Sequence, residues 1–246
     1  MVVGLTMAPV ASAAGVARAC CVVAWLALVG AGPALAEPSN LAPGFSTLPK
    51  GAKIVIMPPD IELFSVSAGG VTEPKAEWTQ VAETYLHAAV NKNAERLGLQ
   101  AQDIAENDLD ELAEINALHG AVARSIALHH MGGGNLALPT KDNKLDWSLG
   151  TAVEPIRQKS GGDYALFIWI RDSYASAERK ATMVLMALLG VGLTGGIQIG
   201  YASLVDLRSG QVMWFNRLGR GSGDLREPEA AGETVTALLK NFPGSQ

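Results

Sequence analysis

The chain has 246 residues and a formal net charge of −5; 48% of its residues are hydrophobic and 17% are charged. The low charged fraction and the positive mean hydropathy of +0.19 exclude an intrinsically disordered chain. The acidic balance argues against nucleic acid as a partner, because nucleic-acid binding needs a basic face.

The first 36 residues have the pattern of a secretory signal. They contain no Asp or Glu, a single positive charge at Arg18, an apolar run after it and an Ala-Leu-Ala ending. We expect cleavage between Ala36 and Glu37, with translation starting at Met1 or Met7. An uncleaved membrane anchor is the alternative, although the apolar run is shorter than the ~20 residues that a spanning helix needs.

Both cysteines, Cys20 and Cys21, lie inside this segment. The exported chain therefore has no thiol, no disulfide and no thiolate metal ligand. Neither cysteine follows the apolar run, which is where the cysteine of a lipoprotein stands. We expect a periplasmic or secreted protein. Without disulfides, its hydrophobic core alone must stabilise the fold.

The first half of the remaining chain predicts short strands followed by two helices. Residues 37–50 are rich in Pro, Ser and small residues and predict a flexible lead-in to one domain over 51–246. Apolar periodicity and turn residues place the next elements. These are a strand at 53–57 stopped by Pro58-Pro59, an extended run at 61–66, a helix over 74–97 with Pro74 in its first turn, and a helix over 109–130 with Asp108 and Glu111 as a capping box.

The second half predicts a covered strand and a C-terminal hairpin. After a polar loop at 135–146 and a short helical stretch near 147–159, the run 163–170 is apolar on both faces, which is typical of a central strand. Residues 197–207 and 211–215 flank a Gly-containing turn, and a helix follows from Glu227-Pro228. This order predicts a single-domain α/β (α+β) fold with a mixed sheet, helices packed on it, and a C-terminal β-hairpin followed by a helix.

Three short motifs resemble a group of bacterial envelope domains. They are KIVIMP from Lys53, GDYAL from Gly162 and SLVDLRSGQVMW from Ser203. Their order resembles that in the curli secretion channel CsgG, the penicillin-binding-protein activator LpoB, the TolB N-terminal domain and neisserial lipoproteins of the GNA1162 type. The resemblance implies a non-enzymatic accessory or assembly domain of the envelope and carries over no catalytic residue. The chain departs from the group in two ways. It lacks a usable lipobox, and it has Met57-Pro58-Pro59 where the group usually has Leu-Pro-Phe.

The motif residues have structural roles that can be stated without the family. Gly162 lets the chain leave a helix and enter a strand beside Asp163, and Gly210 supplies a positive φ in the hairpin turn. Asp206 accepts backbone N–H groups across that turn, and Trp214 gives a large face for core packing.

No charged residue occurs between Ala181 and Val205, and this stretch belongs to an apolar, Gly-rich insert at about 173–196. It has three interpretations. The first is a buried helix that ends at Gly190, followed by a glycine connection and a strand. The second is a transmembrane helix, which the glycines would weaken. The third, which the resemblance implies, is a membrane- or partner-facing element whose contact residues are Leu185, Leu188 and Leu189.

Several patterns suggest an enzyme or ligand site, and each has a plainer explanation. Residues 190–195 fit G-x-G-x-x-G, but a helix precedes and a strand follows, which is the reverse of a dinucleotide site. His119 and His130 could share a helix face for metal, yet both continue an apolar stripe. Arg217, Arg220 and Arg226 flank glycines and suggest an anion-binding loop or a solvated exit from the hairpin. We therefore assign no catalytic residue, metal or cofactor.

The sequence thus favours an exported, non-enzymatic envelope protein that acts as an accessory or assembly factor through protein–protein or membrane contacts. Its expected partner is another envelope protein or a second copy. One alternative is a membrane-inserted assembly or secretion subunit that uses residues 173–196. The other is a metal-binding protein or enzyme that uses His119 and His130.

Overall fold

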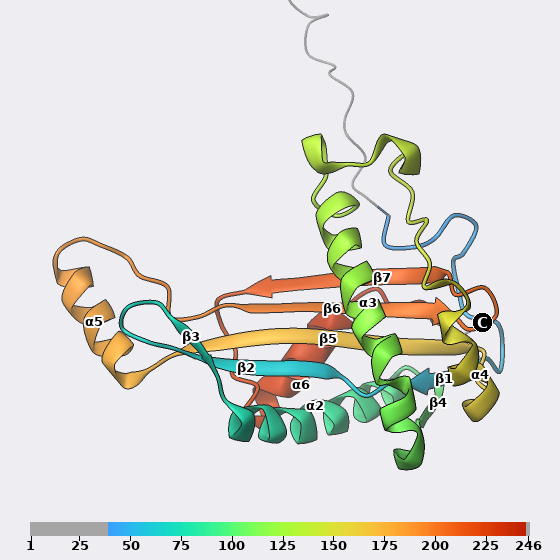
Figure 1. Cartoon of the computed structure of the whole chain (residues 1–246), viewed down its shortest axis with the longest axis horizontal. Helices are drawn as coiled ribbons and strands as arrows, with labels where there is room; N and C mark the ends of the chain where they lie inside the picture. Colours follow the sequence, from blue (N-terminus) through green and yellow to red (C-terminus); the bar gives the residue numbers. More distant parts are fainter. Residues whose placement is uncertain (1–38, 245–246) are drawn as a thin grey trace, which may run out of the picture. The chain divides into compact units, whose positions relative to one another are not determined.

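The computed structural model describes residues 39–244. The expected signal segment, its cleavage site between Ala36 and Glu37, and the start of the lead-in lie outside these residues. The described part is a seven-stranded mixed sheet with helices packed on it (Figure 1), which confirms the α/β prediction.

The long strand β5 (Tyr164–Ala175) lies at the centre of the sheet. Along one side it pairs in parallel first with β1 (Lys53–Ile56) and then with β2 (Asp60–Val66), which Pro58-Pro59 separates from β1. Along the other side it pairs with antiparallel β6 (Gln198–Asp206). The other strands are β3 (Thr72–Pro74) beside β2, β4 (Gln100–Asp103) beside β1 and β7 (Val212–Arg220) beside β6.

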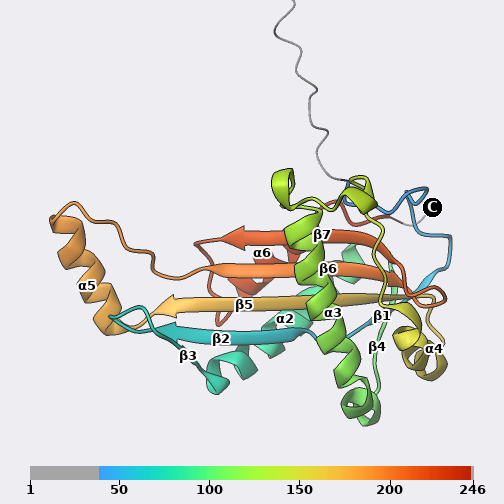
Figure 2. The ribbon, with the colours of Figure 1, turned by 45° about the horizontal axis from the view of Figure 1, so that its top comes forward.

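Helices cover both faces of this sheet (Figures 1 and 2). The helices α2 (Ala76–Arg96) and α6 (Pro228–Leu238) pack on one face over one apolar cluster, and α3 (Leu109–His129) and α4 (Glu154–Ser160) pack on the other face over a second. The strand β5 is buried on both faces because its side chains alternate between these two clusters. The described residues also contain four short 3₁₀ segments, at Glu106–Asp108, Gly134–Leu136, Pro139–Lys141 and Gly150–Val153.

Two expected helix starts are wrong in detail. Pro74 belongs to β3, and α2 begins only after Lys75. Asp108 makes no capping hydrogen bond, because its carboxylate forms an ion pair with Lys159 of α4 at 2.8 Å. A tertiary partner has replaced the local capping box.

The lead-in forms no helix or strand over residues 39–50, yet it lies against the sheet. Ala42 donates a backbone hydrogen bond to Met213 O at 2.9 Å, and Phe215 N donates one to Asn40 O at 2.9 Å. Leu48 is buried in the apolar cluster under α2 and α6. Residues 39–48 are therefore held on the domain, because their apolar side chains help to cover its core.

Two glycines before β5, Gly161 and Gly162, share the role that the sequence assigns to Gly162 alone, which is to let the chain leave a helix and enter a strand. Gly161, which ends α4, has a φ of +64°, so the change of direction is made there. A Cβ on Gly162 would overlap the Val55 side chain. Gly162 thus permits close packing against β1, and the Asp163 carboxylate next to it accepts a hydrogen bond from Lys53 N at 3.1 Å.

The hairpin turn is built as the sequence predicts. The Asp206 carboxylate accepts hydrogen bonds from the backbone N–H groups of Arg208 and Ser209, at 2.7 and 3.0 Å. Gly210 has a φ of +72°. Trp214 is fully buried and packs edge-on against Phe242, with ring centroids 5.0 Å apart.

Candidate functional site: the α5 arm

An arm projects from the sheet between two paired strands. We define the α5 arm as residues 176–196, which contain the helix α5 (Ala177–Leu188) and a glycine-rich return to β6. Its two ends are neighbours, because Asp172 of β5 pairs with Gln198 of β6. In Figures 1 and 2 α5 lies beyond the end of the sheet.

Hydrogen bonds fix the base of the arm. Ser176 caps α5 by accepting a hydrogen bond from Arg179 N at 3.2 Å. The Arg179 guanidinium donates to Thr194 O from Nε and from one terminal nitrogen, at 3.0 and 2.9 Å, and also to Ser67 O. At the root, Ser173 N donates to Ile197 O at 3.1 Å. The base is thus tied to β5, to the β2–β3 turn and to its own return segment.

The distal half of the arm carries an exposed apolar stripe. Spacings of one and four residues place its members on one side of α5. The exposed fractions are 66% for Val184, 59% for Leu185, 80% for Leu188 and 71% for Leu189. With Val191, the arm holds five of the eleven large hydrophobic side chains that are exposed among residues 39–244. Contiguous exposed apolar surface of this kind marks interaction sites.

These exposures overturn the interpretation of α5 as a buried helix. No residue of α5 is buried, because no helix or strand of the described residues packs over its distal turns. The helix does end where expected, as Gly190 has a φ of +78° and Val191 N donates to Met186 O at 2.9 Å. Among the described helices none is both long and apolar enough to cross a membrane.

A buried polar network lies at the root of the arm. The Asp172 carboxylate is 2% exposed and accepts hydrogen bonds from Tyr174 Oη and Gln198 Nε2, both at 2.5 Å. Gln198 Oε1 accepts in turn from Arg220 Nε at 2.8 Å and from Thr234 Oγ1 at 3.1 Å. Burial raises the pKa of Asp172, and burial together with the bond to Asp172 raises that of Tyr174. The network joins β5, β6, β7 and α6 beneath the arm.

The two candidate metal-ligating histidines have separate partners. His119 is buried, stacks on Phe167 and forms a hydrogen bond between its Nε2 and Ser203 Oγ at 2.8 Å. His130 Nε2 pairs with Ser39 O at 2.8 Å. Burial lowers the pKa of His119 to about 3, so its ring is neutral at ordinary pH. Residues 39–244 contain no cluster of His, Cys, Asp or Glu that could hold a metal ion.

The other predicted ligand patterns are dispersed in the structure. Residues 190–195 lie between α5 and β6, so a strand and not a helix follows them directly. Arg220 belongs to the buried network, and Arg226 pairs with Asp224 at 2.6 Å while stacking over Tyr174. Arg217 is exposed on β7. The three arginines form no common anion loop.

No protein-family model and no curated protein sequence matches this chain. Solved structures match it at low similarity. A dodecamer of a PelC variant from Paraburkholderia phytofirmans is 13% identical with a TM-score of 0.39, and the match covers 81% of this chain and 94% of that one.

Two further solved structures belong to the envelope group that the motifs resemble. Lipoprotein GNA1162 from Neisseria meningitidis is 15% identical with a TM-score of 0.33, over 78% of this chain and 97% of that one. The LpoB C-terminal domain from Salmonella enterica is 10% identical with a TM-score of 0.28, over 73% and 87%. The chain thus resembles that group at low identity.

Proposed function

We propose that this chain is an exported, non-enzymatic protein of the bacterial envelope that acts as an accessory or assembly factor through contacts made by the α5 arm. The exposed stripe of Val184, Leu185, Leu188 and Leu189 carries the proposal. Keeping four such side chains in water forgoes about 1.5–3 kcal/mol each relative to full burial, so a covering surface would be strongly favoured. The signal-like leader and the envelope-type motifs support the compartment.

The favoured occupant of the stripe is another envelope protein. Apolar residues at spacings of one and four on one side of a helix match the pattern with which amphipathic helices enter protein grooves. The braced base supports this proposal, because an arm held in one conformation loses less entropy on binding. The return segment needs no partner of its own, since Arg179 already holds it through Thr194.

Shallow membrane contact is the second candidate, and the lack of any charge from Ala181 to Val205 favours it. The 12 residues of α5 span only about 18 Å at 1.5 Å per residue, against ~30 Å for the hydrocarbon core of a bilayer. The arm would therefore enter one leaflet at most. This candidate predicts that the protein floats with protein-free vesicles, whereas partner docking does not.

The test replaces Leu185 and Leu189 together by Glu, with Val81→Glu on α2 as a control at another exposed apolar position. We expect the double variant to lose crosslinks to its partner in intact envelopes while keeping the wild-type melting temperature. Equal crosslinking by the double variant and the wild type would contradict the proposal. If the double variant unfolds while the Val81→Glu variant stays folded, the four side chains of the stripe stabilise the fold instead of binding a partner.

A further inference from the structure

A second surface feature lies on the opposite side of the sheet from α2 and α6. It is a groove of about 520 Å³ between the second half of α3 and the strands β6 and β7. This volume lies within the range of small-molecule sites. The residues that line it and carry the inference are Arg124, Leu128, Ile197, Ile199, Tyr201 and Arg217.

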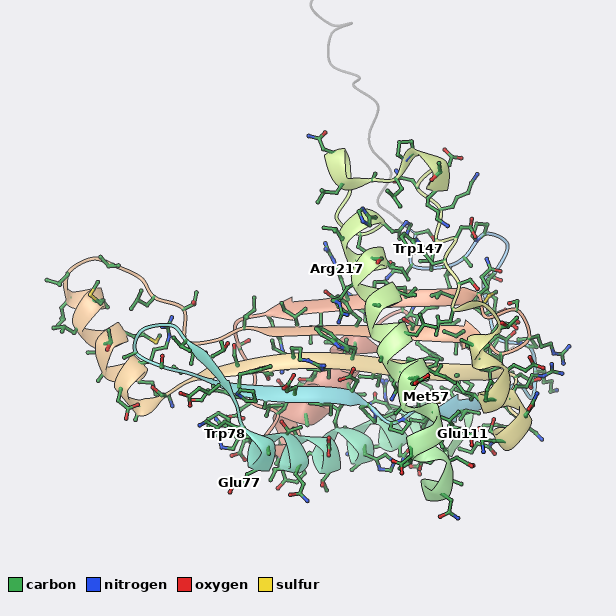
Figure 3. All side chains as sticks on the ribbon, viewed as in Figure 1. Met57, Glu77, Trp78, Glu111, Trp147 and Arg217 are labelled. Atoms are coloured by element: carbon green, nitrogen blue, oxygen red, sulfur yellow. The ribbon has the colours of Figure 1, made fainter. Side chains whose placement is uncertain are left out.

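The groove brings together two guanidinium groups that have no anionic partner. Arg124 and Arg217 are exposed, and neither forms an ion pair or a side-chain hydrogen bond within residues 39–244. Tyr201 of β6 pairs in register with Arg217 of β7, and both arginines lie close enough to Tyr201 to act electrostatically on its hydroxyl. Figure 3 shows Arg217 beside α3. In a chain of net charge −5, this is a local concentration of positive charge.

An aromatic stack holds this part of the surface in place. Tyr201 is half-buried and stacks on Trp169, with ring centroids 5.1 Å apart. Arg124 lies over the Trp169 ring at 5.6 Å, and Gly120 of α3 lets the helix approach that ring closely. The Tyr201 hydroxyl has no hydrogen-bond partner among the described residues. A donor is therefore available in the same groove as the two arginines.

The remaining lining is aliphatic. Leu128 is 48% exposed and Ile197, just before β6, is 53% exposed; Ile199 lies between Ile197 and Tyr201 in the chain. Gly219 has no atom within 4 Å of where a Cβ would stand, so the floor at this point is open. One end of the groove thus presents cations and a hydroxyl, and the rest presents apolar surface.

We propose that this groove binds a single-chain amphiphile with an anionic head, whose phosphate or carboxylate lies between Arg124 and Arg217 and whose aliphatic chain lies along Leu128 and Ile197. Guanidinium groups form strong, charge-assisted hydrogen bonds with both kinds of head. The ligand could be a free amphiphile or a lipid still in a bilayer. The inference does not depend on the function of the α5 arm.

The experiment is calorimetric titration of the purified protein with dodecyl phosphate below its micelle concentration. Inorganic phosphate and a neutral twelve-carbon glycoside test the head and the chain separately. We expect dodecyl phosphate to bind at least tenfold more tightly than either. Arg124→Gln and Arg217→Gln should each weaken binding about tenfold, on the scale of one charge-assisted hydrogen bond. Exposed Arg157→Gln on α4 is the matched control.

Three outcomes would overturn the site. These are equal affinity for dodecyl phosphate and the neutral glycoside, unchanged affinity in the Arg124→Gln/Arg217→Gln double variant, or an equal loss in Arg157→Gln. A parallel titration with vesicles that contain an anionic phospholipid separates the two sources. Binding to dodecyl phosphate alone identifies a free amphiphile, and arginine-dependent binding to both identifies a bilayer lipid. Circular dichroism checks that each variant is folded.

Discussion

The Arg179 guanidinium donates two hydrogen bonds to the Thr194 carbonyl, at 3.0 and 2.9 Å, across the 15 residues that separate them. A third hydrogen bond from the same side chain goes to Ser67 O at 3.3 Å. One side chain thus connects the first turn of α5, the return segment of the arm and the β2–β3 turn. These bonds brace the base of the arm, although no residue of α5 is buried.

Arg179→Gln should loosen the arm without destabilising the domain. The variant loses bonds at the base, while the two apolar clusters under the sheet are untouched. We expect faster amide hydrogen exchange confined to residues 180–196, with the melting temperature within about 2 °C of the wild type. Lys180→Gln, at the next position, is the control. Uniform acceleration of exchange across the sheet would disprove the local role.

His119 should make stability depend on pH. Its pKa falls from 6.5 to about 3 on burial, so the unfolded chain takes up a proton that the folded chain refuses. The free energy of unfolding should therefore fall by about 1.4 kcal/mol for each pH unit below about 6.5, until the pH nears the folded value. Urea unfolding at about pH 7, 6 and 5 measures this slope.

The matched variants are His119→Gln and His87→Gln. His119→Gln cannot take up the proton, so its stability should lack this slope. His87 is exposed beside Asp103, and His87→Gln should retain it. A slope shared equally by the wild type and His119→Gln would show that other groups cause it.

Asp172→Asn should remove a pH dependence of the unfolding free energy whose sign is opposite to that caused by His119. Burial raises the pKa of Asp172 above 3.8, so the folded state favours the protonated acid. Wild-type stability from this group is present at low pH and is lost as the pH rises between the unfolded and folded pKa values. The wild type minus Asp172→Asn difference in unfolding free energy should thus decline over that interval. Exposed Asp146→Asn is the control, and a flat difference would contradict the assignment.

Gly210→Ala should be strongly destabilising. Gly210 has a φ of +72°, and a Cβ there would overlap the carbonyl oxygen of Gly150. Strain and overlap together should cost about 2–4 kcal/mol in urea unfolding. Gly232→Ala in α6 is the matched control, because a Cβ there meets no atom within 4 Å. That change should stabilise the helix by up to about 1 kcal/mol, and equal effects of the two would refute the argument.

Local signals predicted most of the fold. The alternation of apolar residues and the turn chemistry of Asp206 and Gly210 sufficed for β6, for the hairpin turn and for the first half of β7, since those interactions are close in sequence. The strand β7 continues to Arg220, beyond its predicted end at Phe215. The capping box at Asp108 failed because Lys159, 51 residues away, pairs with its carboxylate. The periodicity of apolar residues along one helix cannot indicate that a residue distant in sequence will bind the capping side chain.

The candidate sites were harder to predict. The apolar composition of residues 181–189 is the same whether a neighbouring element covers them or not, so the sequence left three interpretations of α5 open. The groove beside α3 could not be seen at all. Tyr201 and Arg217 face each other across the hairpin, but only the tertiary structure brings Arg124 of α3 to them. The spacing of apolar residues describes one helix or strand at a time, so it cannot predict a site shared by several elements.

Because Asp172 pairs with Gln198, the arm is an insertion whose two ends lie side by side in the sheet. Its length and composition can change in evolution without shifting the register of a single strand, since the ladder between β5 and β6 closes beneath it. An assembly partner could therefore be exchanged by rewriting some twenty consecutive residues while the scaffold stays constant.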